Sequence, residues 1–373
     1  MSYFPGSGSK EQKQDKQNDK KPNIRKNISW TLVSLVLAVL TVRMVIKQSS
    51  SISAGELFSI IASSNKLFFL TAVICSALFV WAEGIAIGII LKFAGYPRRR
   101  RQNLIYSTSD IYFSGITPSA TGGQPASAFF MMRDGIPGGV ATAALVLNLM
   151  MYTISIIVLG LFSIFVSPGA FLGFGRFSRL LIAAGFIGLT GLSAGFLLIL
   201  KKGSIVFGLL SKCVTMLYNR KIIGEKDRKI RRLEKIRKDY ESCSELIAGR
   251  KKVPFYTLLW NIIQRSFQMV VPSILYLSLG GEPVKAPVIF ARQCLITIGY
   301  NFVPIPGGMG ISDYLMIDGF SGIMGTQMAY RVELLSRGIT FYICVSLCGL
   351  ITLAGYLITG NRRVAGSRSG GED

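Results

Sequence analysis

Residues 301–310 read Asn-Phe-Val-Pro-Ile-Pro-Gly-Gly-Met-Gly and stand inside a long apolar region. A related stretch at residues 117–125 reads Thr-Pro-Ser-Ala-Thr-Gly-Gly-Gln-Pro, again with apolar sequence on both sides. Proline removes a backbone donor and glycine weakens a helix, so each stretch predicts a break in a membrane helix. Broken backbone at membrane depth is tolerated where it is buried in protein or lines a polar cavity. Two breaks in matching halves favour a transporter-like site, with structural kinks as the alternative.

Composition places the chain in the membrane. Half of its 373 residues are apolar, its mean hydropathy is +0.46, and several apolar runs exceed the roughly 18 residues needed to cross a bilayer. The net charge of +23 is explained by lysine and arginine in cytoplasmic loops, so we expect no nucleic-acid partner. The chain has no histidine, and its six cysteines lack ligand-like pairing. We therefore expect neither a metal nor a cofactor.

The apolar runs predict an all-α polytopic fold with six full spans, at residues 28–46, 67–91, 138–166, 178–200, 255–279 and 331–359. The two broken segments, residues 104–132 and 287–324, are predicted to be re-entrant hairpins. Full crossings would place the basic segment 201–252 outside the cell, whereas hairpins keep it with the arginines of residues 98–101 in the cytoplasm.

The pattern of span, span, hairpin, span occurs twice, and the second copy runs in the opposite direction. It predicts an inverted repeat, with one copy at residues 28–166 and another at 178–358, the latter interrupted by the cytoplasmic segment 201–252. Residues 1–27 are predicted to be a disordered basic tail and residues 360–373 a second tail, both cytoplasmic. Apolar residues recur every three or four positions within 225–248 opposite a basic face, which favours a helix on an anionic lipid surface.

Polar residues inside spans are the first candidates for a functional site. Glu83 lies within the second predicted span, and Asn261, Gln264, Arg265 and Gln268 share one helix face in the fifth. Charges in spans are costly and usually face a partner or a cavity, so we expect Glu83 and Arg265 to be close. Arg265 either forms a structural salt bridge or receives an anionic headgroup, for which a guanidinium is well shaped.

The broken segments supply the remaining candidates. Helix N-termini that follow Gly-Gly turns direct partial positive charge at a cavity, which favours phosphate. Neither turn matches a nucleotide-binding loop, and no catalytic set of residues is apparent. The candidates are Asp110, Thr117, Gly122, Gly123 and Gln124 in the first segment, and Arg292, Pro304, Pro306, Gly307, Gly308, Gly310 and Asp313 in the second.

At the same motifs, over residues 28–360, the chain resembles the membrane region of the lysylphosphatidylglycerol synthase family, the flippase part of bacterial multiple peptide resistance factors. The resemblance rests on residues 117–125, on Arg133-Asp134-Gly135, and on residues 304–310 with the acid Asp313 three residues later. It implies movement of an anionic or aminoacylated phospholipid, or a lipid-linked headgroup, between the leaflets of a bacterial plasma membrane. The family often has glutamate and then arginine after its first Gly-Gly, where this chain has Gln124 and Ser127.

Two other functions remain open. The inherited family name implies a phosphatidylglycerol lysyltransferase, an enzyme that needs a cytosolic transferase domain for which spans reaching residue 359 leave no room. The chain could instead be a non-catalytic membrane partner of a separate synthase. Homo-oligomerisation, the identity of the lipid and the energy source also stay open.

Overall fold

The computed structural model describes residues 54–117, 122–201, 252–303 and 311–368, Gly308 and Gly310, and scattered positions between 207 and 249. All described residues belong to one compact unit, Ile52–Asp373. These residues form helices and no strand, so the predicted all-α class is confirmed for the described part of the chain. The predicted span at residues 28–46 and the tail at 1–27 lie outside it.

Within the described residues, four helical segments are long and apolar enough to cross a membrane. They are Lys66–Phe93 (α4), Gly138–Val166 (α7), Arg176–Leu198 in α9, which extends to Lys201, and Thr326–Ile358. The last joins α16 (Thr326–Arg337), the π-helical turn η5 (Gly338–Ile343) and α17 (Cys344–Arg368). Each corresponds to a predicted span, and together they establish a multi-pass membrane protein.

The predicted span at residues 255–279 differs from the structure. It is divided into α12 (Lys252–Met269) and α13 (Val271–Ser278), which meet at Val270. Pro272 stands in the first turn of α13, where its missing N–H costs nothing, but within one continuous helix it would remove a hydrogen bond. This proline accounts for the division.

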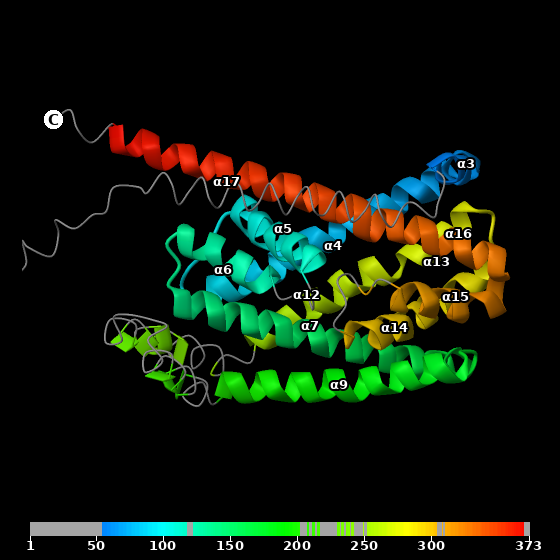
Figure 1. The fold of residues 1–373 in the computed structure, drawn as a ribbon, viewed down its shortest axis with the longest axis horizontal. Helices are drawn as coiled ribbons and strands as arrows, with labels where there is room; N and C mark the ends of the chain where they lie inside the picture. Colours follow the sequence, from blue (N-terminus) through cyan, green and yellow to red (C-terminus); the bar gives the residue numbers. More distant parts are fainter. Residues whose placement is uncertain are drawn as a thin grey trace, which may run out of the picture. The chain divides into compact units, whose positions relative to one another are not determined.

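Each of the two broken segments folds as a pair of packed helices. The first consists of α5 (Arg100–Ile116) and α6 (Gly123–Arg133), and the second of α14 (Ala286–Asn301) and α15 (Ile311–Met324). Figure 1 places the first pair in one half of the long axis of the bundle and the second pair in the other half. The helix breaks are thus where the sequence predicts them, while membrane re-entry stays a prediction.

Helix α7 joins the two halves of the hydrophobic core. One cluster packs Leu147 of α7 with Leu91 and Met131, and another packs Ile156 of α7 with Leu295 and Phe320. Both clusters are almost fully buried, so α7 forms the spine against which both helix pairs are fixed. Short helices complete the fold: α3 (Ala54–Ser63), α8 (Pro168–Leu172) and η3 (Pro283–Lys285).

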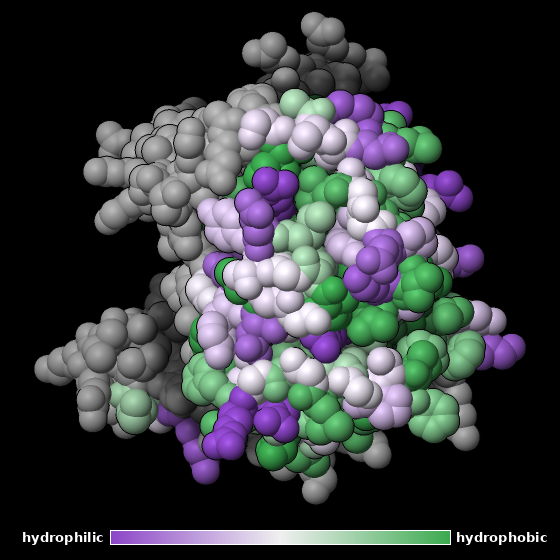
Figure 2. All heavy atoms as spheres, turned by 90° about the vertical axis from the view of Figure 1, so that its right-hand side faces the viewer, coloured by the Kyte–Doolittle hydropathy of each residue, from purple (hydrophilic) through white to green (hydrophobic). Residues whose placement is uncertain are grey.

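Large apolar side chains cover the outer faces of α9 and α17. Ile187 is 76% exposed and Leu350 is 64% exposed, values that suit contact with lipid chains. Figure 2, which views the bundle from the end at which α3 and α16 lie, shows hydrophobic side chains reaching the surface beside hydrophilic ones.

The basic segment is described only at scattered positions. Tyr240 is 2% exposed and packs edge-to-face on Phe207, and the neighbouring Leu233 and Ile236 pack against the core cluster of α4 and α7. The apolar side of these residues therefore contacts protein, and a role of the basic side in lipid binding stays a prediction.

Candidate functional site

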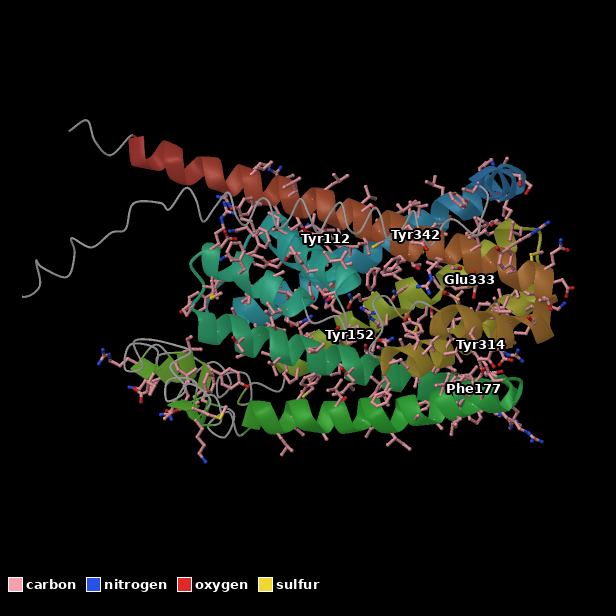
Figure 3. The ribbon with its side chains drawn as sticks, viewed as in Figure 1. Tyr112, Tyr152, Phe177, Tyr314, Glu333 and Tyr342 are labelled. Carbon is pink, nitrogen blue, oxygen red and sulfur yellow. The ribbon has the colours of Figure 1, made fainter. Side chains whose placement is uncertain are left out.

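Arg265 of α12 occupies a slot between two aromatic rings. Its guanidinium carbon lies 4.7 Å from the ring centre of Phe79 on α4 and 4.1 Å from that of Tyr152 on α7. The side chain is only 6% exposed. Figure 3 shows Tyr152 in the middle of the bundle. Two rings stabilise the cation and fix its plane, which leaves the N–H groups at its edge to select a partner.

The edge of that guanidinium is incompletely paired. Nη1 donates a 2.8 Å hydrogen bond to Oε1 of Gln268, one turn along α12, while the buried Nε has no acceptor. Among the described residues, no carboxylate oxygen comes within the 4.0 Å of a salt bridge with Arg265. A buried donor without a partner is costly, so its retention calls for an explanation.

Two carboxyl groups lie near Arg265 without pairing with it directly. Glu83 of α4 accepts a 3.0 Å hydrogen bond from Nε2 of Gln264, and its carboxyl interacts with that of Asp110 on α5. Both residues interact electrostatically with Arg265. The expected proximity of Glu83 and Arg265 is thus present, in the form of a cluster and not of a simple salt bridge.

Asp110 ties the first helix pair together. It accepts hydrogen bonds from Ser114 at 3.1 Å and from Nε2 of Gln124, on α6, at 2.8 Å. Gly123 makes this arrangement possible, because a Cβ at that position would lie 2.5 Å from the backbone oxygen of Asp110. Gln124 therefore connects the second helix of the pair directly to the cluster around Arg265.

Thr117 closes the turn between α5 and α6. Its hydroxyl donates to the carbonyl of Phe113 at 2.6 Å and accepts from the backbone N–H of Gly122 at 2.9 Å. Thr117 and Gly122 therefore shape the turn.

The second helix pair reaches the same cluster through Asn301, the last residue of α14. Its Oδ1 accepts a 2.7 Å hydrogen bond from the hydroxyl of Tyr152, whose ring lies against Arg265. The ends of both broken segments thus contact residues that surround one arginine. The inverted repeat and the central site stay predictions.

Asp313 belongs to a second ionic cluster, at the start of α15. It pairs with Arg337 of α16, which also donates to Ser312 at 2.6 Å and lies 3.9 Å from Glu333. Its Oδ2 accepts from the backbone N–H of Gly310 and so caps the helix. Asp313, a candidate from the sequence, thus pairs with Arg337 and not with Arg265. Sequence reasoning passed over Arg337 and Glu333, although their charges inside a predicted span were an available signal.

Glycines shape the backbone before α15. Gly308 and Gly310 have φ angles of +64° and +81°, which other residues rarely adopt. Gly308 also faces the ring of Tyr300 so closely that a Cβ would lie 2.7 Å from it. Pro304, Pro306 and Gly307 lie outside the described residues.

Arg292, another sequence candidate, is held elsewhere. It donates to the carbonyl of Gly319 and lies 5.7 Å from the ring centre of Phe174, among residues that join α8, α9 and α15. Nearby, Asp318 accepts from the backbone N–H of Gly175 at 2.9 Å, and Phe177 packs on Tyr314 (Figure 3). These contacts give Arg292 a place in the packing of the second half, apart from the Arg265 cluster.

A cavity lies between the two clusters. The space that it offers to water-sized groups is about 80 Å³, which is below the usual range of small-molecule sites. Its wall includes one residue from each cluster: Gln268, which binds Arg265, and Arg337, which binds Asp313. The π-helical turn η5 contributes Thr340 and Phe341, and π-turns are frequent at functional sites. The other lining residues are Pro272, Gln293, Tyr300, Ser312, Met316 and Ser336.

Comparisons with known proteins identify the family. The part of the chain that the structure describes holds no group of three or more potential metal ligands. A search of curated proteins finds no match. A family model described as the lysylphosphatidylglycerol synthase transmembrane region matches residues 30–348, which include both broken segments, the Arg265 cluster and the cavity. The chain therefore belongs to the lysylphosphatidylglycerol synthase transmembrane-region family.

Proposed function

We propose that this protein moves the headgroup of an anionic phospholipid between the two leaflets, with Arg265 as the binding residue for the phosphate. The unpaired edge of Arg265 carries the proposal. A guanidinium clamped between two rings, with a buried Nε that has no acceptor, suits an oxygen that arrives in its plane. Phosphate presents oxygens of this kind, and its charge is what most opposes the crossing of hydrocarbon.

The surroundings of Arg265 fit this role. Arginine near the middle of a membrane helix costs roughly 2.5–3.5 kcal/mol on insertion scales. Glu83 and Asp110 offset the charge through space while leaving the edge of the guanidinium without a direct salt bridge. A phosphate could thus bind to Arg265 without first breaking a tight ion pair, which keeps binding reversible.

The broken helices suit a path for a headgroup whose acyl chains stay in lipid. Both helix pairs reach the cluster, through Gln124 and Asp110 on one side and through Asn301 and Tyr152 on the other. The cavity bounded by Gln268 and Arg337 gives a headgroup space next to Arg265. Movement of one pair relative to the other would change which side of the bundle the cavity faces.

The test is lipid movement in proteoliposomes. Vesicles containing purified protein and a phosphatidylglycerol with a fluorescent acyl chain are treated with dithionite, which quenches the outer leaflet. We expect full-length protein to make most of the remaining fluorescence accessible, whereas protein-free vesicles should leave about half protected. Arg265→Leu should reduce the rate at least tenfold, because the phosphate loses its charged partner. Arg265→Lys should retain an intermediate rate, because it keeps the charge without the fork-shaped edge.

A matched control is Thr257→Val, about two turns earlier on the same helix. Thr257 is fully buried and donates to the carbonyl of Val253 at 2.9 Å, so its loss perturbs α12 without touching Arg265. This variant should move lipid at nearly the wild-type rate when it elutes as a monodisperse protein. Arg265→Leu moving lipid as fast as the wild type would overturn the proposal, and so would a wild-type rate equal to that of protein-free vesicles.

A further inference from the structure

The two buried acids beside Arg265 outnumber its positive charge. Glu83 is 7% exposed and Asp110 is 5% exposed, and their carboxyls interact with each other. Arg265 acts on both through space, but among the described residues neither carboxyl forms a salt bridge. With both acids ionised, two negative charges would face one positive charge inside the bundle, which is costly. A proton on the pair removes this excess, as in other buried pairs of carboxyls.

The second ionic cluster shows a different treatment of acids. Asp313 pairs directly with Arg337, and Glu333 lies 3.9 Å from the same guanidinium. In the first cluster the acids receive hydrogen bonds from neutral amides, at 3.0 Å for Glu83 and 2.8 Å for Asp110. An amide N–H can donate to a protonated carboxyl as well as to an ionised one. The first cluster therefore accommodates both protonation states, whereas the salt bridge of Asp313 requires the ionised state.

An amide oxygen beside the pair lacks a donor. Gln264 is 1% exposed, and its Nε2 donates to Glu83 while its buried Oε1 accepts no hydrogen bond. The two ends of one amide are neighbours, so this Oε1 lies close to the same carboxyl. A carboxylate has no hydrogen to give, whereas a protonated carboxyl has an O–H. The unpaired acceptor thus favours a proton-bearing group at the pair.

The other titratable groups that interact with the pair, within the described part of the chain, bring no positive charge. Tyr152 of α7 interacts with both acids and with Arg265, and Tyr300 of α14 acts on Tyr152. Cys348 of α17 interacts with Glu83. Phenols and thiols are neutral or negative. An anion that binds to Arg265 therefore takes up the cation that offsets the pair.

From these observations we propose that Glu83 and Asp110 form a proton-binding site that takes up a proton when a phosphate binds to Arg265, so that lipid and proton cross the membrane together. This rests on the proposed function, which places the phosphate at Arg265. The proton comes from water on the side where the lipid enters, and a new O–H bond forms on a carboxyl oxygen. That bond breaks when the phosphate leaves, and the proton returns to water on the other side. An anionic lipid together with a proton carries no net charge across the bilayer.

The first experiment measures proton uptake on binding, without any lipid movement. A short-chain phosphatidylglycerol is added to full-length protein in weakly buffered detergent that contains a pH-indicating dye. We expect an uptake of about one proton per bound lipid near neutral pH, because coupling between two ligands is reciprocal. The double variant Glu83→Gln, Asp110→Asn should lose the uptake. The same lipid should still raise its Tm, because both amides keep the shape of the acids and Arg265 is unchanged.

A matched control is Asp318→Asn, a change of the same type apart from the Arg265 cluster. Asp318 accepts a 2.9 Å hydrogen bond from the backbone N–H of Gly175, which an asparagine can also accept, so this variant should keep the uptake. Lipid that binds without proton uptake would overturn the inference, and so would an uptake that persists in the double variant.

Infrared difference spectra locate the proton. Binding of an ether-linked phosphatidylglycerol, which has no ester carbonyl of its own, should produce the C=O band of a protonated carboxyl in the wild type. Glu83→Gln alone should shift or remove this band, because the remaining carboxyl has lost its partner. This single variant keeps the test valid if the double variant does not fold. A band that Glu83→Gln leaves unchanged would place the proton elsewhere and refute the site.

The second experiment asks whether a pH difference drives lipid. Proteoliposomes that are more acidic outside contain a short-chain fluorescent phosphatidylglycerol, which albumin extracts from the outer leaflet. For a difference of about one pH unit, we expect the ratio of inner to outer lipid to rise by up to about tenfold. A protonophore should abolish the rise, and so should the double variant. A potassium diffusion potential at equal pH should leave the ratio unchanged, because the loaded complex is neutral.

The two experiments separate this inference from the proposed function. Proton uptake on binding, in a protein that moves no lipid, would support the acid pair as a proton site and refute lipid movement. Lipid movement without proton uptake and without any effect of the pH difference would keep the proposed function and refute the proton site. A lipid ratio that follows a sodium gradient instead of the pH difference would also overturn the inference.

Discussion

Gly123→Ala is the most informative test of how the first helix pair is built. A Cβ at Gly123 would lie 2.5 Å from the backbone oxygen of Asp110 and would also overlap the side chains of Asp110 and Ser114. The side chains could rotate away, but the backbone oxygen cannot. The α6 helix must therefore move off α5, and the hydrogen bonds of Asp110 with Ser114 and Gln124 must stretch.

The expected magnitude follows from those contacts. Overpacking costs about 1–3 kcal/mol. Two weakened hydrogen bonds cost about 0.5–1.5 kcal/mol each. The gain from replacing glycine in a helix is at most about 1 kcal/mol. The net destabilisation of Gly123→Ala is therefore roughly 1–6 kcal/mol.

The measurement is the free energy of unfolding in mixed detergent micelles. Gly191→Ala is the matched control, because Gly191 lies in α9 and a Cβ there meets nothing within 4 Å. We expect that control to be neutral or up to about 1 kcal/mol more stable. If Gly123→Ala is as stable as the wild type, α5 and α6 do not pack as described, and the position of Asp110 loses its support.

Three further predictions address the two clusters and the topology. Arg337→Leu should lower the free energy of unfolding by roughly 3–5 kcal/mol, because Asp313 and Glu333 would remain as partly buried charges without a cation. Adding Asp313→Asn should recover part of the loss in the same assay. A single variant as stable as the wild type would contradict the ion-pair cluster. Tyr152→Phe should lower the free energy of unfolding by about 1–3 kcal/mol, because Oδ1 of Asn301 loses its donor. Tyr152→Leu should lower it further, because Arg265 also loses the ring that lies against it. Equal stabilities of the two variants would show that the ring does not stabilise Arg265. In a background without native cysteines, Arg228→Cys should not react with an impermeant thiol reagent applied to intact cells but should react after lysis, because the basic segment is predicted to be cytoplasmic. Labelling of intact cells would contradict that orientation and the predicted hairpins with it.

Much of the fold was predictable because its signals are local. Long apolar runs predicted α4, α7 and α9 to within a few residues, and prolines and glycines predicted both helix breaks. The i, i+3, i+4, i+7 spacing in α12 placed Gln264, Arg265 and Gln268 on one face, and the structure gathers them around Glu83.

What the sequence could not give was the choice of partner across helices. Asp313 and Glu83 are both acids among the sequence candidates, yet Glu83 lies near Arg265 whereas Asp313 pairs with Arg337, 24 residues further along the chain. The aromatic slot needs Phe79 and Tyr152 from two other helices, and nothing in the local pattern of either predicts that contact. The cavity likewise depends on side chains from five separate elements and on a π-turn. Such features follow from tertiary packing, which periodicity does not encode.

The most direct measurement asks whether a lipid headgroup enters the bundle at all. Full-length protein in lipid nanodiscs would be irradiated with a phosphatidylglycerol that carries a photoreactive diazirine in its headgroup, and the cross-linked residues read by mass spectrometry. We expect cross-links at cavity residues such as Gln268, Gln293 and Thr340, and their loss when excess unlabelled phosphatidylglycerol competes. Cross-links confined to exposed positions such as Arg100 and Arg101, with none in the cavity, would contradict a headgroup site beside Arg265.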